Sequence, residues 1–353
     1  MIATTAFSTL CRPLVRQLIQ RKNLEANEVE SLFHAILTSP DEAMNEEDSV
    51  LLSAFLVALA SKGETVQELL GAARGMRSHS CRIQAIGSPV VDIVGTGGDS
   101  LHTFNVSTTS AFVAAGAGLV VAKHGNRAVS SRCGSADVLE CCGVNLNLPP
   151  ERVEELVAEL GIGFLFAQQF HPSMRRVAPL RKKLGLRTLF NLLGPLTNPA
   201  GAGCVLLGVY DATLTETFAH VLRELGCRRA MVVHGDDGMD ELTVTTRSRV
   251  TEFLGDGFRT YDFFPELYFD GELSPPEELR GGDAEENAMI LHGILSGKIR
   301  GGKRHIVLLN AAAALFCANR SRTMEEGIRL AEESIDSGAA HEKLCRLVEL
   351  SRK

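Results

Sequence analysis

The sequence lacks a long hydrophobic run. Its most apolar window, residues 111–122, holds twelve residues and includes two glycines, whereas a helix that spans a bilayer needs about 20 apolar residues. We therefore expect no membrane-spanning segment. The chain also lacks a Cys-x-x-C pair and a recognisable secretory leader, and its nine cysteines are an odd number. These features favour reduced thiols in the cytoplasm over a disulfide framework.

The chain also has fewer basic residues than acidic ones. The chain has 36 lysines and arginines against 43 acids, a formal net charge of -7. Nucleic-acid binding without sequence preference draws most of its free energy from basic side chains that neutralise phosphates, so we expect no nucleic-acid partner. The 353 residues and the apolar fraction of 45% are enough to bury a sizeable core in one large or two unequal domains.

Hydrophobic spacing divides the chain into two regions. From Thr9 to about Arg77, apolar residues recur at helical intervals, so we interpret the early bases between Arg12 and Lys22 as part of an amphipathic helix and not as a transit peptide. Beyond this region, short aliphatic runs alternate with helical stretches, a pattern typical of a parallel sheet covered on both faces. The expected strands are Val90–Val94, Gly118–Ala122, Gly163–Phe166, Cys204–Val209, Ala230–Val233 and His305–Leu309.

A glycine-rich turn follows the first of these strands. Gly95-Thr96-Gly97-Gly98-Asp99 has neither the lysine of a P-loop nor the spacing of a dinucleotide-binding fingerprint. Exposed N–H groups in such a turn suit a phosphate or pyrophosphate. The helix that Asn105 to Thr109 open would present a second anion-binding feature beside it. An ordinary strand-to-helix turn is the alternative, and the glycines alone do not exclude it.

Two later segments also carry polar side chains suited to a ligand. Lys123 to Asp137 concentrates hydrogen-bond donors after a predicted strand, and Asp240-Glu241 places two adjacent carboxylates after another. A solvated cationic loop and a solvated acidic turn are the corresponding simpler interpretations.

The order of the motifs is more specific than any one of them. Those above are followed in register by the segments His171–Met174, Ala178–Arg181, Phe190–Pro199, His234-Gly235, Gly238–Glu241 and Leu308–Ala314. This set resembles that of the anthranilate phosphoribosyltransferases along nearly the whole chain.

The resemblance implies a small all-helical N-terminal domain and a large α/β domain, with a mostly parallel central sheet flanked by helices and an active site between the domains. We place the helical domain at residues 1–87, with added helices from about 180–200, and the α/β domain at 88–353. The family is usually a homodimer through its helical domain. The implied reaction transfers the phosphoribosyl group of phosphoribosyl pyrophosphate to the amine of anthranilate in tryptophan biosynthesis.

The resemblance also implies ligands for particular residues. Phosphoribosyl pyrophosphate would be bound by Gly95, Gly98, Asp99, Thr103, Asn105, Val106, Ser107, Thr108, Lys123, His124, Gly125, Asn126, Arg127, Ala128, Val129, Ser130, Ser131 and Ser135. Anthranilate would be bound by Gly95, Asn126, His171, Arg181, Gly194 and Pro195. Two Mg²⁺ ions would be held with the help of Ser107, Asp240 and Glu241.

Within these sets, Lys123 would contact the phosphates directly and Arg181 would pair with the anthranilate carboxylate through its forked guanidinium. We assign no general base, because an aromatic amine is neutral near pH 7 and attacks with its own lone pair. His171 is therefore expected to bind and not to catalyse.

The sequence also allows two other hypotheses about function. A pyrimidine nucleoside phosphorylase shares the two-domain fold but cleaves a nucleoside with phosphate, and the Lys123–Arg127 motif and Asp240-Glu241 argue against it. A non-catalytic nucleic-acid-binding relative of the fold is disfavoured by the net charge.

Overall fold

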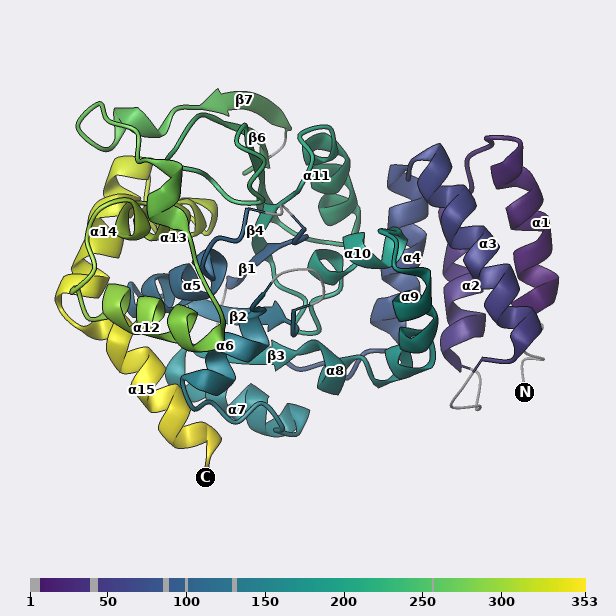
Figure 1. Ribbon diagram of the computed structural model, residues 1–353, viewed down its shortest axis with the longest axis horizontal. Helices are drawn as coiled ribbons and strands as arrows, with labels where there is room; N and C mark the ends of the chain where they lie inside the picture. The colour runs from purple at the N-terminus through teal and green to yellow at the C-terminus, as the bar shows by residue number, and fades with distance from the viewer. Residues whose placement is uncertain (1–6, 39–43, 85–88, 99–100, 129–131, 256) are drawn as a thin grey trace. The chain divides into compact units, whose positions relative to one another are not determined.

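Contacts along the backbone divide the chain into two units. The computed structural model describes residues 7–38, 44–84, 89–98, 101–128, 132–255 and 257–353. Unit 1 comprises Met1–Cys81 and Phe170–Pro199, and unit 2 comprises Arg82–Gln169 and Ala200–Lys353. Figure 1 labels their helices and strands. Among the described residues, no helix has the length and apolar character needed to cross a membrane.

In the part of unit 1 that the structure describes, the regular elements are all helices. The predicted amphipathic helix forms near its start and buries Cys11, Leu14 and Leu18 on one face. The helices Ala26–Thr38 and Val66–Ser78 make close contact at two glycines of the second helix. A Cβ on Gly71 would overlap Ala26, and a Cβ on Gly75 would overlap Phe33. The helices are α1 (Phe7–Ile19), α2 (Ala26–Thr38), α3 (Glu46–Lys62), α4 (Val66–Ser78), η1 (Pro172–Arg176), α9 (Ala178–Leu184), α10 (Leu189–Leu192) and η2 (Gly194–Leu196). The short α8 (Ala167–Phe170) leads into the second stretch.

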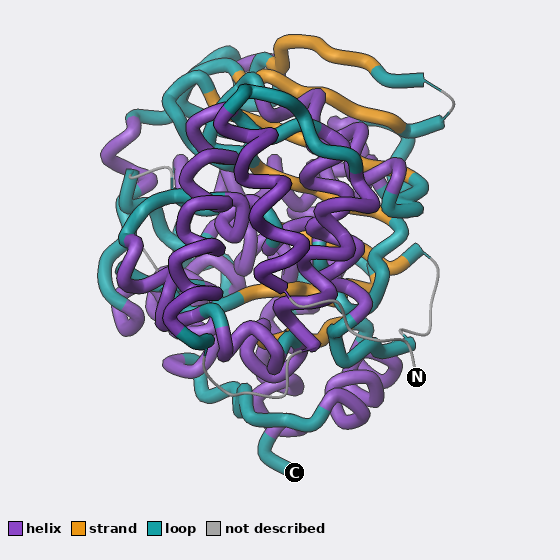
Figure 2. Tube along the Cα trace, turned by 90° about the vertical axis from the view of Figure 1, so that its right-hand side faces the viewer, coloured by secondary structure: helices purple, strands orange, loops and turns teal. Residues whose placement is uncertain are grey.

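Unit 2 is built on a sheet of seven strands in the order β3-β2-β1-β4-β5-β6-β7. The first five strands of this order pair in parallel, and β6 and β7 add antiparallel ribbons at one edge. In Figure 2 the strands lie one above another. They are β1 (Val90–Gly95), β2 (Val120–Gly125), β3 (Ile162–Phe166), β4 (Cys204–Gly208), β5 (Arg229–Gly235), β6 (Ser248–Phe253) and β7 (Arg259–Phe263).

Helices flank this sheet. α5 (Val106–Gly116) packs on β1 and β2, α13 (Gly302–Cys317) on β4 and β5, and α11 (Leu214–Glu224) on β5 and β6. In Figure 1, α13 and α11 lie on opposite sides of β4. The expected fold class is thus confirmed. The remaining helices are α6 (Ser135–Cys141), α7 (Pro150–Leu160), η3 (Pro265–Leu267), η4 (Pro276–Leu279), α12 (Ala284–Leu295), α14 (Met324–Asp336) and α15 (Ala339–Ser351).

Three expectations about elements need correction. The strand expected at His305–Leu309 is wrong, because these residues lie inside α13, a helix that is buried almost all round. A fully buried helix has a continuous apolar sequence much like that of a buried strand. The expected set also omitted β6 and β7. The sequence predicts a helix over Glu325–Gly338 as the last element of the chain, but α15 follows it.

Candidate functional site

The glycine-rich turn after β1 lies against Asp240. The Gly97 N–H donates to Asp240 Oδ2 at 2.7 Å, and a Cβ on Gly95 or Gly208 would overlap Asp240 itself. Gly97 and Gly98 have φ angles of 68° and 87°, in the left-handed region that glycine tolerates without strain. Glycine is therefore required here both by backbone conformation and by the space that the carboxylate occupies.

The first turn of α5 lies against the neighbouring carboxylate. The Ser107 N–H donates to Glu241 Oε1 at 3.2 Å, which places an acid at the positive end of a helix. Asn105 is the N-cap residue, as expected, but its side chain makes no capping hydrogen bond. Its Nδ2 instead donates to the Cys133 carbonyl at 3.2 Å. Asn105 therefore joins the start of α5 to the loop that follows β2.

Lys123 lies beneath these groups, in β2. Its side chain is buried, and its ammonium donates to the Ile93 carbonyl at 2.6 Å and to Ser107 Oγ at 3.2 Å. Burial lowers the pKa of Lys123, while the nearby charges of Asp92, Glu241 and Asp240 oppose that shift. The expected direct contact between Lys123 and phosphates stays a prediction.

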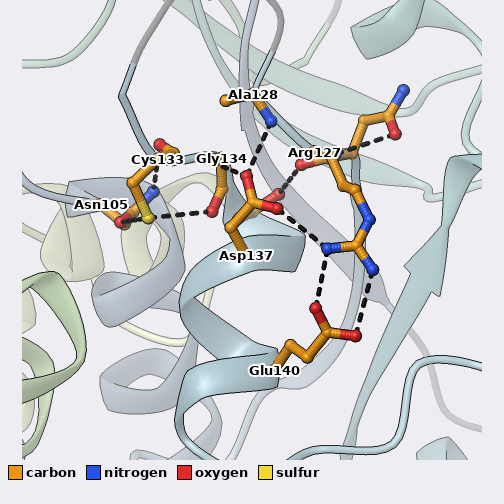
Figure 3. A network of polar contacts seen from close by, with 9 residues as sticks. Asn105, Arg127, Ala128, Cys133, Gly134, Asp137 and Glu140 are labelled. Carbon is orange, nitrogen blue, oxygen red and sulfur yellow. Dashed lines mark hydrogen bonds and ion pairs between the residues drawn. The ribbon is translucent and has the colours of Figure 1, made fainter. Parts of the chain in front are cut away.

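The loop after β2 is held by an acidic pair on α6. The Asp137 carboxylate accepts from the N–H groups of Ala128 and Gly134, both at 2.9 Å. The Arg127 guanidinium donates to Asp137 at 3.0 Å and to both oxygens of Glu140 at 2.8 and 3.1 Å, as Figure 3 shows. The side chain of Arg127 thus stabilises the loop, and its pKa is raised by these partners.

The other predicted residues of this loop lie close by. The Asn126 carbonyl accepts from Ser135 Oγ at 3.3 Å and from the Ala136 N–H at 3.1 Å. The His124 N–H donates to Asp92 Oδ1 at 3.2 Å. A Cβ on Gly125 would overlap Ser135 Oγ, so the close approach of these two residues requires glycine at position 125.

Three more residues predicted to bind phosphoribosyl pyrophosphate lie just before or in the first turn of α5. Thr103 forms an isolated bridge with Arg280, and Val106 is buried at the start of the helix. Thr108 Oγ1 is buried and has no hydrogen-bond partner among the described residues. Asp99, Val129, Ser130 and Ser131 lie outside the described residues.

The oxygen ligands for a metal are few. Within the described ranges, no group of three or more His, Cys, Asp or Glu side chains could hold a metal ion. Asp240 and Glu241 are adjacent in the chain, and Glu241 Oε1 accepts from the backbone N–H of Ser107, whose hydroxyl is a third oxygen group. This set fits Mg²⁺, which commonly takes one or two protein carboxylates and completes its coordination with water and substrate phosphates.

Unit 1 contains the remaining predicted residues. His171 Nε2 lies 3.1 Å from the Thr197 carbonyl, and burial is the main cause that lowers its pKa to about 4. The ring is therefore neutral near pH 7, which agrees with a binding and not an acid role. Gly194 and Pro195 belong to η2, and Pro195 is buried.

Arg181 is the cation of this group. Its guanidinium lies 5.2 Å from the centroid of the Phe190 ring, and burial lowers its pKa. It forms no salt bridge with any acid among the described residues.

Comparison with known proteins agrees with this arrangement. The family described as "Glycosyl transferase family, helical bundle domain" matches residues 12–80, and "Glycosyl transferase family, a/b domain" matches residues 87–341. The anthranilate phosphoribosyltransferase of Desulfosudis oleivorans is 52% identical over 336 residues, which cover 95% of this chain and 97% of that protein. The chain belongs to the anthranilate phosphoribosyltransferase family.

Solved structures of anthranilate phosphoribosyltransferases share the fold. The enzyme from Thermus thermophilus is 44% identical with a TM-score of 0.88 over 96% of this chain and 99% of that one. The Saccharomyces cerevisiae enzyme in complex with PRPP and Mg is 29% identical with a TM-score of 0.89 over 98% of both chains. The family expectation is confirmed, and the phosphorylase and nucleic-acid-binding hypotheses are set aside.

Several residues that hold or shape the predicted segments were not among the predicted site residues. Gly97, Asp137, Glu140, Asn287 and Asn310 hold or shape the predicted segments. A polar residue inside an apolar helix is a usable signal for Asn310, which interrupts the run from Ile306 to Leu315. The others form ordinary polar patterns whose partners only folding brings close.

Proposed function

We propose that this chain joins the phosphoribosyl group of phosphoribosyl pyrophosphate to the amine of anthranilate and releases pyrophosphate. One observation carries the proposal: the glycine-rich turn, the start of α5 and Asp240-Glu241 are linked by direct hydrogen bonds, in a chain that is 52% identical over 95% of its length to an anthranilate phosphoribosyltransferase. The transferred carbon becomes cationic as its bond to pyrophosphate lengthens, and the leaving group gains negative charge. Donors fixed around that leaving group stabilise this state.

The donor substrate binds in unit 2 in this proposal. Backbone N–H groups of the turn and of the first turn of α5, other than those of Gly97 and Ser107 that bond the carboxylates, contact its phosphates. The hydroxyl of Thr108 is a buried polar group with capacity for a ligand. Lys123 acts at least through Ser107, because its ammonium donates to the Ser107 hydroxyl. We propose that Gly95, Gly98, Asp99, Thr103, Asn105, Val106, Ser135 and the segment 123–131 also bind phosphoribosyl pyrophosphate.

Two Mg²⁺ ions accompany the donor. Bound magnesium would neutralise charge on the pyrophosphate as it leaves. Ser107 would hold one ion through its hydroxyl, and Asp240 and Glu241 would anchor the other. The N–H groups of Gly97 and Ser107 orient the two carboxylates, and the all-oxygen donor set supports Mg²⁺ over softer metals.

Arg181 carries the acceptor half of the proposal. A guanidinium that is partly removed from water, with no acidic partner among the described residues, can recover its desolvation cost by pairing with a ligand carboxylate. We also propose anthranilate-binding roles for His171, Gly194 and Pro195 of unit 1 and for Gly95 and Asn126 of unit 2. No general base is required, and positioning of the two reactants supplies much of the rate.

We also propose a domain division, an oligomeric state and a cellular location for this protein. The helical domain comprises residues 1–87 with added helices from about 180–200, and the α/β domain comprises 88–353. The matched ranges 12–80 and 87–341 support this division. We also propose a homodimer through the helical domain, and a cytoplasmic location, which nine reduced cysteines support.

Product analysis tests the proposal. The purified chain, incubated with anthranilate, phosphoribosyl pyrophosphate and Mg²⁺, should form N-(5-phosphoribosyl)anthranilate and pyrophosphate in equal amounts by mass spectrometry and a pyrophosphate assay. A parallel incubation with thymidine and phosphate should give no free base. Release of thymine without the anthranilate product would instead support a phosphorylase.

A further inference from the structure

The proposed metal carboxylates lie in a loop without helix or strand, residues 236–247 between β5 and β6. Its outer part is fixed by local contacts. The Asp237 carboxylate accepts from the Met239 N–H at 3.1 Å and from the Thr243 hydroxyl at 2.6 Å, and the Gly235 N–H donates to the Met239 carbonyl at 2.9 Å. These contacts do not hold the residue that directly follows Glu241.

Asn310 of α13 holds that residue. Its Oδ1 accepts from the Leu242 N–H at 3.1 Å, and its Nδ2 donates to the Leu242 carbonyl at 2.8 Å. Nδ2 also donates to the Ile306 carbonyl at 2.9 Å. One side-chain amide thus binds both polar backbone groups of Leu242, and Asn310 and Leu242 are both fully buried. Rotation or displacement of this peptide segment would break two buried hydrogen bonds at once.

The same helix also holds α5. Ser110, three residues after Ser107, donates from Oγ to the Val307 carbonyl of α13 at 3.3 Å. α13 therefore contacts both elements that supply oxygen ligands, α5 with Ser107 and the loop with Glu241. The direct bond between the Ser107 N–H and Glu241 Oε1 depends on both attachments.

We propose that Asn310 is a positioning residue for the Mg²⁺-binding carboxylates, a role that rests on the proposed function of Asp240 and Glu241. It fixes the peptide after Glu241 against α13 and so sets the positions of the two carboxylates, Glu241 beside Ser107 and Asp240 beside Gly97. An asparagine is a poor helix former and costs free energy when its amide is buried. Its place in an otherwise apolar helix is explained by this attachment.

A purely structural role would lower stability without changing metal binding, so the test needs both measurements. Asn310→Leu preserves the approximate shape and removes every hydrogen bond to Leu242. Asn310→Asp keeps an acceptor for the Leu242 N–H but loses donation to both carbonyls. Ser334→Ala is the matched control, because it removes one buried hydrogen bond, from Ser334 Oγ to the Val113 carbonyl at 2.8 Å, that touches neither the loop nor Asn310.

The probe is Mn²⁺ with phosphoribosyl pyrophosphate, titrated into each full-length variant and followed by water-proton relaxation. Thermal unfolding of each variant is measured as well, to give its stability. We expect Asn310→Leu to weaken binding of the Mn²⁺ complex by about tenfold or more, as is typical when a residue that orients a metal ligand is lost. Asn310→Asp should weaken it less, and Ser334→Ala should bind as the wild type does.

Wild-type affinity in folded Asn310→Leu would overturn the positioning role. If Asn310→Leu does not fold, Asn310→Asp is measured instead. Wild-type affinity for the Mn²⁺ complex in Asn310→Asp would also overturn the positioning role. The same titration of Glu241→Gln distinguishes the positioning role of Asn310 from the metal-binding role of Glu241. Weakened binding in Glu241→Gln beside wild-type affinity in Asn310→Leu defeats only the positioning role. Unchanged binding in Glu241→Gln defeats the proposed metal role itself.

Discussion

Asn287 donates from Nδ2 to Asn105 Oδ1 at 3.0 Å, while its own Oδ1 accepts from the Gly282 N–H at 2.9 Å. Asn105 in turn donates to the carbonyl of Cys133. This partly buried chain of amides joins α12, the N-cap of α5 and the loop after β2. The two segments proposed to bind phosphoribosyl pyrophosphate are therefore held by a residue that is far from both in sequence.

Replacing Asn287 with leucine should weaken donor binding. The change removes the acceptor of the buried Gly282 N–H, at a cost of about 1–3 kcal/mol for an unpaired buried group. It also removes one of the two donors to Asn105 Oδ1, which keeps only the Cys133 thiol at 3.4 Å. We expect a raised KM for phosphoribosyl pyrophosphate with little change in the KM for anthranilate. Steady-state kinetics measure both. Ser351→Ala, which removes a buried acceptor of the Asn145 N–H, is the control, and an unchanged donor KM in folded Asn287→Leu would contradict the prediction.

Adding one methyl group at Gly95 should disturb magnesium use. The new Cβ would overlap the Asp240 carboxylate, so Gly95→Ala should raise the Mg²⁺ concentration needed for half-maximal rate by roughly tenfold. Gly255→Ala offers a matched comparison, because its Cβ would meet nothing within 4 Å. Equal magnesium requirements in the two variants would show that the close contact with Asp240 has no functional role.

Arg181 should determine affinity for the acceptor. Charge-assisted hydrogen bonds contribute about 1.5–3 kcal/mol, so Arg181→Ala should raise the KM for anthranilate by about 10- to 100-fold. Arg181→Lys should recover little, since an ammonium cannot reproduce the forked contact. Lys182→Ala, on an exposed neighbour in α9, should leave kinetics unchanged. A loss of donor affinity in place of acceptor affinity would count against the assignment.

His171 should make stability depend on pH. The folded pKa is about 4, and the unfolded value is about 6.5. Above pH 6.5 both states are neutral and the residue contributes nothing. As pH falls from 6.5 to 4, only the unfolded chain gains the proton, so stability falls, by about 2 kcal/mol at pH 5.

Urea unfolding of the wild type and His171→Gln at pH 7 and pH 5 tests this expectation. The wild type should lose more stability between the two pH values than the variant does. The same loss in both proteins would mean that His171 is not the source.

The sequence predicted the central strands well because they are buried on both faces. Val90–Gly95 and Cys204–Gly208 read as aliphatic runs bounded by glycine. The same criterion failed for His305–Leu309, since a buried helix is equally apolar. β6 and the edge strand β7 were missed because charged and polar residues interrupt their apolar residues.

The site could be predicted only in part. The motifs gave the turn, the start of α5 and Asp240-Glu241, each of which follows a strand in sequence. That Arg127 would pair with Glu140, or that Asn310 would hold Leu242 across 68 residues, depends on tertiary contacts that no local pattern records.

The most direct test of the central claim is the loss of anthranilate fluorescence with phosphoribosyl pyrophosphate, measured with and without Mg²⁺ for the wild type and for Asp240→Asn/Glu241→Gln. We predict consumption by the wild type that stops when the metal is removed, and a strongly reduced rate in the variant even at high Mg²⁺. Wild-type rates in the variant, or consumption that continues without metal, would contradict the account.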